Sequence, residues 1–211
     1  MRFRGWRERS NAQTELCKPI TATSAASGTT WLYFIRAQMS EIWFTADTHF
    51  CHGNIIKYHA RPFGSVQEMD HTMIARWNTL VRTDDIVYHL GDFARASLPV
   101  MQELRKSLNG RITLLKGNHD GSWVRCNRIG FDRVLRSFSP TIMGVLLHLA
   151  HRHDKYTDAR EGSYILCGHV HKRWRLQGNI LNVGVDQWDF YPVHSQQVME
   201  VFGIAQLSEH L

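Results

Sequence analysis

The chain has 211 residues, of which 43% are hydrophobic, and it carries a formal net charge of +6 at pH 7. This length favours one domain with a substantial core, and no apolar run approaches the roughly 20 residues that a membrane helix needs. The four cysteines show no CxxC spacing, so we expect reduced thiols in a cytoplasmic protein. We also expect no membrane partner.

The first 38 residues differ from the rest of the chain. They contain six Lys and Arg but only two Glu, so they account for +4 of the net charge, and a Ser-, Thr- and Ala-rich stretch follows. We predict that residues 1–38 are a disordered or non-native extension and that residues 39–211 form the domain, with Met39 placed where an initiator would fit. A transit peptide is the second interpretation, because the segment is poor in acidic residues, and a secretory signal is the third.

From residue 41 onward the pattern alternates between strands and helices. The apolar run 41–46 predicts a buried strand that ends at Asp47, and residues 53–60 predict a short helix. Residues 65–68 (Ser-Val-Gln-Glu) form a capping box. This box opens a helix whose apolar residues recur at helical spacing as far as Leu80, a stripe that we assign to core packing.

Further strands and helices complete the expected fold. Residues 85–90 predict a strand before Asp92, residues 98–108 a helix capped by Ser97, and residues 112–116 another strand. The second half predicts mostly strands, near residues 141–150, 163–167, 179–185 and 197–204. The expected fold class is α/β, with packed sheets, helices outside them and functional residues at strand ends.

Polar residues form five short clusters in this framework, and four of the clusters directly follow apolar runs. They are Asp47-Thr48-His49, Gly91-Asp92, Gly117-Asn118-His119-Asp120, a histidine between 148 and 153, and Gly168-His169-Val170-His171. A single Asp-x-His is more often a turn or a helix cap than a metal site. All five together indicate metal binding, and Asp, His and Asn without thiolate suit a pair of Mn²⁺, Fe or Zn ions better than structural zinc.

Each ligand type has a use in a two-metal site. Two neighbouring cations repel each other, so a bridging carboxylate is needed between them, and Asp92 is the natural bridge. Asp47 and His49 alternate along an extended backbone, so both can face one ion, and residues 169 and 171 repeat that geometry. Asn118 supplies a neutral oxygen. Such centres catalyse in-line attack on phosphate esters.

Two further histidines lie beside the proposed ligands. His119 follows a proposed ligand, so it can protonate the leaving group or stabilise the phosphoryl oxygens, and Asp120 would hold its ring in one tautomer. At the end of the strand 141–150, the apolar pair before it favours His151 as a ligand. His148 is the alternative.

These motifs resemble those of the calcineurin-like metallophosphoesterase superfamily, which are D-x-H, G-D, G-N-H-D/E, a histidine after a strand, and G-H-x-H. The strings at residues 45–50 (TADTHF) and 182–186 (NVGVD) are similar to a small, single-domain branch of bacterial and phage type. The resemblance covers about residues 41–203. It implies a sandwich of two β-sheets flanked by helices, with a dinuclear centre at one edge.

The resemblance also implies a ligand set for each metal. One metal would be held by Asp47, His49, Asp92 and His171, and the other by Asp92, Asn118, His151 and His169. His119 would be catalytic and paired with Asp120. Two departures are Cys51, where this branch has glycine, and the absence of an acidic residue shortly after Asp92.

We therefore expect a metallophosphoesterase that hydrolyses phosphomonoesters or phosphodiesters through two divalent metal ions and a bridging hydroxide. Mn²⁺ is the expected metal, with Fe, Zn and Ni as alternatives. A catalytically weak metal-binding scaffold and a DNA or RNA nuclease are the alternative functions, and the low charge outside residues 1–38 weighs against tight duplex binding.

A small phosphate ester is the expected substrate, although a nucleic acid is retained as an alternative. The sequence does not determine the oligomeric state. Arginines in the loops 50–64, 121–132 and 152–162 are compatible with an anionic substrate, but each is more typical of a solvated surface charge. They are Arg61, Arg125, Arg128, Arg152 and Arg160.

Overall fold

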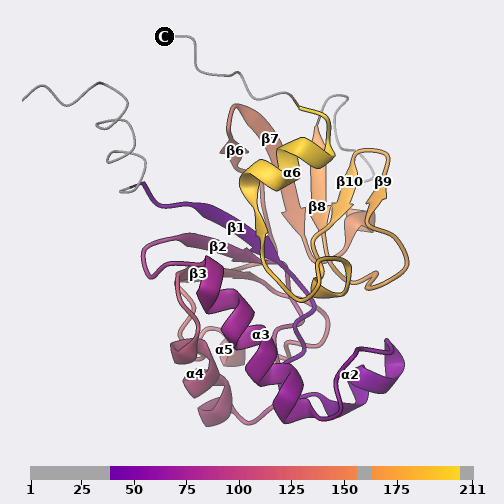
Figure 1. Cartoon of the computed structure of the whole chain (residues 1–211). Helices are drawn as coiled ribbons and strands as arrows, with labels where there is room; N and C mark the ends of the chain where they lie inside the picture. Colours follow the sequence, from indigo (N-terminus) through magenta and orange to yellow (C-terminus); the bar gives the residue numbers. More distant parts are fainter. Residues whose placement is uncertain (1–38, 156–162, 205–211) are drawn as a thin grey trace, which may run out of the picture. The chain divides into compact units, whose positions relative to one another are not determined.

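A computed structural model describes residues 39–155 and 163–204 of the chain, and two mixed sheets form its framework (Figure 1). The prediction for residues 1–38 lies outside the described residues. Within the described part, no helix is both long and apolar enough to cross a bilayer.

The first sheet has five strands in the order β11-β1-β2-β3-β4. The strands β1 (Ile42–Thr45), β2 (Ile86–His89), β3 (Arg111–Leu115) and β4 (Arg133–Leu135) run parallel, and β11 (Val193–His194) pairs with β1 antiparallel. The parallel register places the carboxyl ends of β1, β2 and β3 at one edge of the sheet. The predicted strands that precede the first three clusters are therefore confirmed.

Helices cover one face of this sheet. They are α3 (Val66–Leu80), α4 (Leu98–Ser107) and the short α5 (Trp123–Cys126) (Figure 1). The predicted N-cap of α3 is confirmed, because the Ser65 side chain accepts from the Glu68 amide at 3.1 Å. The second bond differs from that of a capping box, since the Glu68 carboxylate accepts from the Gly64 amide and not from the Ser65 amide. Ser97 is the N-cap of α4 but makes no side-chain capping bond.

The second sheet has the order β5-β7-β8-β10-β9, and β6 pairs with β7 outside that path. β7, β8 and β10 run parallel, and the others pair antiparallel. Its strands are β5 (Ser137–Phe138), β6 (Thr141–Ile142), β7 (Val145–Ala150), β8 (Tyr164–Cys167), β9 (Leu176–Gln177) and β10 (Ile180–Asn182). The predicted strand 141–150 is thus two strands, separated by a turn in which Met143 and Gly144 have positive φ.

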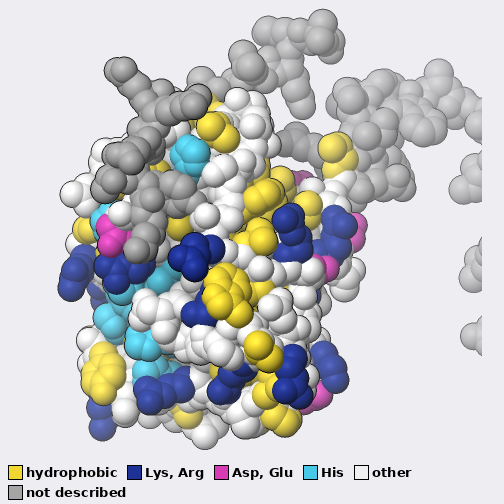
Figure 2. All heavy atoms as spheres, turned by 180° about the vertical axis from the view of Figure 1, so that it is seen from behind, with side chains coloured by type: hydrophobic (Ala, Val, Ile, Leu, Met, Phe, Trp, Pro, Cys, Tyr) yellow, Lys and Arg dark blue, Asp and Glu magenta, His cyan; other side chains and the backbone are white. Residues whose placement is uncertain are grey.

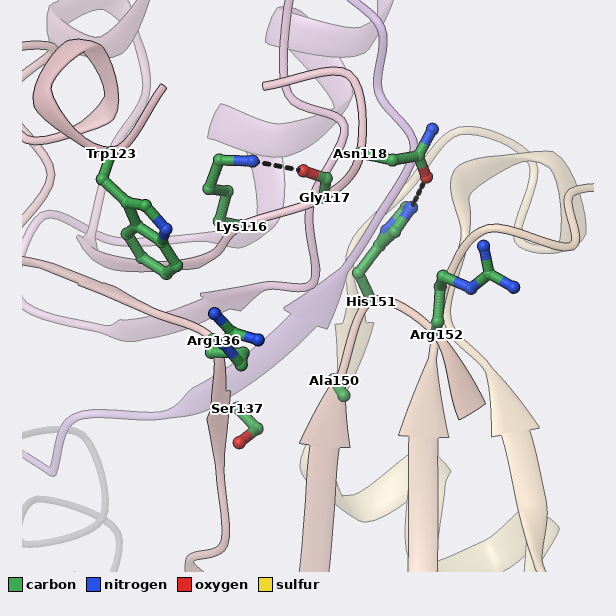
Figure 3. Close-up of a pocket in the computed structure, with 9 residues that line it drawn as sticks. All are labelled: Lys116, Gly117, Asn118, Trp123, Arg136, Ser137, Ala150, His151 and Arg152. Atoms are coloured by element: carbon green, nitrogen blue, oxygen red, sulfur yellow. Dashed lines mark hydrogen bonds between the residues drawn. The ribbon is translucent and has the colours of Figure 1, made fainter. Parts of the chain in front are cut away.

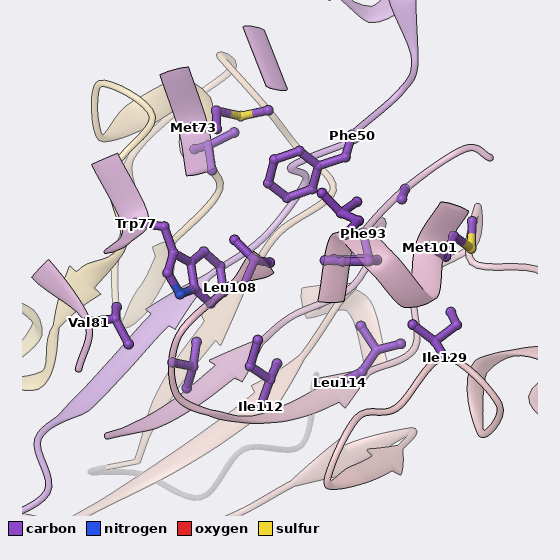
Figure 4. Packing of buried hydrophobic residues seen from close by; sticks show 14 of the residues in the cluster. Phe50, Met73, Trp77, Val81, Phe93, Met101, Leu108, Ile112, Leu114 and Ile129 are labelled. Carbon is purple, nitrogen blue, oxygen red and sulfur yellow. The ribbon is translucent and has the colours of Figure 1, made fainter. Parts of the chain in front are cut away.

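Two apolar clusters hold these layers together. The first includes Met73 and Trp77 of α3 with Ile112 and Leu114 of β3, and it lies between the helices and the first sheet (Figure 4). The second joins the inner faces of the two sheets and contains Phe44, Leu115, Leu147, Leu149, Leu166 and Leu181. Because neighbouring residues of one strand enter different clusters, the first sheet is buried on both faces, as parallel sheets usually are.

The predicted strand 197–204 is wrong, because residues 195–201 form the helix α6 (Ser195–Val201). The His194 side chain caps its first turn by accepting from the Gln196 amide, and the Gln197 side chain accepts from the His194 amide. Ser195, Val198 and Met199 are buried along one side, at helical spacing. Valine favours strands, but the cap and this spacing decide in favour of the helix.

Three short elements complete the described fold. They are α2 (Gly53–Tyr58) and the 3₁₀ helices η1 (His153–Lys155) and η2 (Val185–Gln187). α2 begins just after the first polar cluster, and η2 begins just after β10. Both therefore lie next to the edge at which the polar clusters gather.

Candidate metal centre

Loops at the carboxyl ends of the parallel strands carry the candidate ligands of both sheets. The loop after β1 is fixed to the loop after β2, because the amides of Asp47 and His49 donate to Gly91 and Asp92 at 3.0 Å. The loop after β8 is fixed to the end of β7, since the Gly168 amide donates to the carbonyl of His151, the residue after β7, at 3.1 Å. Figure 2 shows the resulting concentration of histidine side chains on one face, with Lys and Arg side chains around it.

Two groups of three buried side chains have the geometry of metal ligands. Their ligand atoms lie within 4.8 Å of one another, and the groups are Asp47, His49, His171 and Asp47, Asp92, His151. Both groups share Asp47. Asp92 also lies between them, because its Oδ2 is 3.6 Å from His49 Nε2 and 3.4 Å from His151 Nε2. The carboxylates of Asp47 and Asp92 thus both lie between the two groups of candidate ligands.

Two ligand atoms are buried without any hydrogen-bond partner among the described residues: Asp47 Oδ1 and His49 Nε2. An unsatisfied buried polar atom is costly. Burial raises the pKa of Asp47 to about 6, although His151 and His171 partly oppose this. Burial likewise lowers the pKa of His49 to about 3, so its ring is neutral, as a metal ligand must be. Both atoms therefore fit a divalent cation.

His151 lies at the centre of the second group. Its Nδ1 is 2.8 Å from the Leu90 carbonyl, which fixes the ring, and its Nε2 is 2.8 Å from Asn118 Oδ1. Burial lowers its pKa, but the carboxylates of Asp92 and Asp47 and the Leu90 carbonyl outweigh burial and raise the pKa to about 9. Oxygens of Asn118 and Asp92 thus both lie close to His151 Nε2, at 2.8 and 3.4 Å.

The structure separates the two histidines proposed for the fourth cluster. His148 Nδ1 is 2.8 Å from the Ser139 hydroxyl, a residue between β5 and β6, whereas His151 joins the candidate ligands. His169 also lies at the centre, because its amide donates to Asp47 Oδ2 at 2.8 Å and its ring centroid is 5.1 Å from that of His151. Burial lowers the pKa of His169 to about 4, which keeps the ring neutral.

His171 is oriented by a buried ion pair that the sequence did not reveal. Its Nδ1 is 2.8 Å from Asp186 Oδ2, so Nε2 is the ring nitrogen that Asp186 does not contact. Arg61 donates to both oxygens of Asp186, at 2.9 and 3.0 Å. The same guanidinium donates to the carbonyls of Asp47 and Thr48. Arg61 is 4% exposed, so its assignment as a solvated surface charge is wrong.

Asp120 has a different role from the one predicted. Its carboxylate accepts from the amides of Asp92, Phe93 and Gly117, at 2.7 to 2.9 Å, and no hydrogen bond joins it to the His119 ring. It therefore ties the second cluster to the third. His119 is exposed, its amide donates to Asp92 Oδ1 at 2.8 Å, and its ring centroid is 5.5 Å from that of His49.

The backbone at the centre is strained in a systematic way. Asp47, His49, Asp92, His169 and His171 all have positive φ, between 48° and 70°. This region is disfavoured for residues with a side chain, and such strain collects at functional sites.

Close packing around Gly168 brings two loops of the candidate centre together. A Cβ on Gly168 would lie 2.6 Å from Ala46 Cβ and 2.7 Å from Asp47 Oδ2. Only glycine therefore lets the loop after β8 approach the loop after β1 closely enough for the two to share ligands.

Comparisons with known proteins agree with this architecture. The model of the calcineurin-like phosphoesterase superfamily domain matches residues 40–185. An uncharacterized protein of Methanocaldococcus jannaschii is 37% identical over 172 residues, 77% of this chain and 92% of that protein. The gene 66 protein of Mycobacterium phage L5 is 26% identical over 187 residues, 71% of this chain and 88% of its own.

The same fold is found among solved structures. One example is a protein of unknown function from Aquifex aeolicus, with a TM-score of 0.64 and 23% identity, covering 77% of this chain and all of that one.

Proposed function

The chain belongs to the calcineurin-like phosphoesterase superfamily, and we propose that it hydrolyses phosphomonoesters or phosphodiesters with the help of two divalent metal ions. The observation that carries this proposal is the pair of unsatisfied buried ligand atoms, Asp47 Oδ1 and His49 Nε2, beside the Asp92 carboxylate. A site for a neutral ligand would not need carboxylates and neutral imidazoles directed at one point.

The residues divide into two sets around Asp47 and Asp92. His49 and His171 lie on one side, and Asn118 and His151 on the other, with His169 next to His151. When bound there, two divalent cations would supply an activated water and neutralise charge on the phosphoryl oxygens. Mn²⁺ is our proposed metal, because mixed carboxylate, amide and imidazole donors suit it.

His119 is the proposed proton donor. Hydrolysis joins the oxygen of water to phosphorus and breaks the bond from phosphorus to the ester oxygen, which then needs a proton. His119 is exposed, and its backbone is fixed by the bond that its amide donates to Asp92 Oδ1. It can therefore deliver a proton to the leaving oxygen.

The test is a panel of chromogenic mono- and diesters, assayed with the full chain after reconstitution with Mn²⁺, Fe²⁺, Zn²⁺ or Ni²⁺. We expect about two metals per chain and hydrolysis of at least one ester class. The Asp92→Asn variant is the control and should lose metal and activity together. Two bound metals without hydrolysis of any ester would favour a metal-binding scaffold, and no bound metal would overturn the proposal.

A further inference from the structure

A pocket of about 500 Å³ adjoins the candidate metal centre, and Asn118 and His151 belong to both. Figure 3 shows the side chains of Lys116, Trp123 and Arg136 on the same side of His151. Because two lining residues are proposed ligands, an ester held at the metals could extend its alcohol portion into this pocket. The pocket is therefore placed to select that portion of the substrate.

The charged residues that line the pocket are all basic: Lys116, Arg136 and Arg152. Arg152 is paired with Asp154 at 2.8 Å, so its charge is largely compensated. Lys116 Nζ donates to the Gly117 carbonyl, which leaves its charge uncancelled, and Arg136 is exposed and has no ion pair within residues 39–155 and 163–204. Two uncompensated cations favour an anionic group.

Trp123 gives the same pocket an aromatic surface. It is the first residue of α5 and remains 39% exposed, and Lys116 Nζ lies 5.8 Å from its ring centroid. An exposed indole can stack on a flat ring, and base stacking of this kind is sequence-tolerant and strong. Cations and an indole in one pocket therefore match a ligand that has both a negative charge and an aromatic ring.

The size of the pocket argues against a very small ligand. Pockets of 300 to 1,000 Å³ typically hold a whole drug-sized molecule, and this one lies within that range at about 500 Å³. A phosphate group alone would leave most of it empty. A nucleoside with a second phosphate has the size, the ring and the charge that the lining can contact.

We infer that this pocket binds the portion of the substrate remote from the scissile bond, and that this portion is a nucleoside with a second anionic group. Calling this ligand a part of the substrate rests on the proposed phosphoesterase function. The binding itself does not depend on that function. Trp123 stacks on the base, and Lys116 and Arg136 neutralise the second phosphate.

Binding of three probes to the full chain, with and without Mn²⁺, tests the inference by titration calorimetry. The probes are adenosine 3′,5′-bisphosphate, adenosine 5′-monophosphate and ribose 5-phosphate. We expect the bisphosphate to bind most tightly, the monophosphate less tightly and ribose 5-phosphate least tightly. Trp123→Ala should weaken bisphosphate binding about tenfold more than ribose 5-phosphate binding, and Trp123→Phe should keep most of the preference. Arg136→Gln should reduce the preference for the bisphosphate over the monophosphate.

Matched controls are Val124→Ala, next to Trp123 on α5 and 70% exposed, and Arg128→Gln, an exposed arginine outside the lining. Both should keep the wild-type order. Equal affinity for the three probes, or unchanged ratios in both the Trp123 and Arg136 variants, would overturn the inference even if the chain hydrolyses simple esters. The expected order with no hydrolysis of any ester would support the pocket and overturn the proposed function instead.

Discussion

His171 Nδ1 and Asp186 Oδ2 lie 2.8 Å apart in the candidate metal centre, and this contact holds the His171 ring in one orientation. Arg61 holds Asp186 from the other side through two bonds. The buried Arg61 is thus linked to a candidate metal ligand, His171, through one carboxylate. Outer partners of this kind orient a ligating histidine and tune its affinity.

Asp186→Asn should therefore weaken metal binding roughly 10- to 100-fold. It should also destabilise the fold by about 3–5 kcal/mol, because Arg61 would remain buried without its partner. Metal titration and chemical denaturation measure the two effects. Asp189→Asn, three residues further along the chain, is the control. Wild-type metal affinity in the Asp186 variant would show that this pair serves the fold alone.

His151→Ala should remove a metal from the protein, whereas His148→Ala should retain both. The reason is geometric, because His151 Nε2 is 2.8 Å from Asn118 Oδ1, while His148 contacts Ser139. Metal content after Mn²⁺ reconstitution, measured by mass spectrometry, distinguishes the variants. Greater metal loss from the His148 variant would contradict the assignment of the fourth cluster.

The candidate ligands can be proposed from the sequence because the pattern that marks them is local. Each lies directly after a short apolar strand, so the local pattern also places it at a sheet edge. Its partners are not local. Arg61 and Asp186 are 125 residues apart, and nothing near either residue indicates that they meet or that Arg61 is buried.

Two other errors arose from adjacency and composition. Asp120 follows His119 directly, which suggested a contact, but the turn that contains both directs the Asp120 carboxylate back to the amides of Gly117 and Asp92. Val198 and Val201 lie in the segment that was predicted as a strand, and valine favours strands. The cap formed by His194 and Gln197 is the sequence signal that could have identified this segment as a helix.

His119→Ala should lower kcat by roughly 10²–10⁴ while the metal content stays constant, the range expected for loss of a general acid. The loss should be smaller for esters of p-nitrophenol, because that leaving group needs little protonation. Comparing kcat for a p-nitrophenyl ester and an alkyl ester measures the difference. An equal loss for both esters would indicate that the ring stabilises phosphoryl oxygens and does not donate a proton.

Asp85 should contribute an acid-sensitive part of the stability of the first sheet. It is fully buried, and its carboxylate accepts from the amides of Glu41 and Arg82 and from Trp43 Nε1. Burial raises the pKa of Asp85, but these hydrogen bonds and the Arg82 side chain outweigh burial and hold the pKa below its ordinary value of 3.8. The contribution is therefore fully present above that value and is lost as the pH falls below it.

Asp85→Asn should accordingly cost about 1–3 kcal/mol at neutral pH, because buried donors lose a charged acceptor. The difference in unfolding free energy between this variant and the wild type should shrink as the pH falls below 3.8, the ordinary value for Asp85. Urea denaturation at a series of pH values measures it. Asp84→Asn is the matched control, since Asp84 is the adjacent exposed carboxylate and should show neither effect. A difference that stays constant with pH would mean that Asp85 acts through packing and not through its charge.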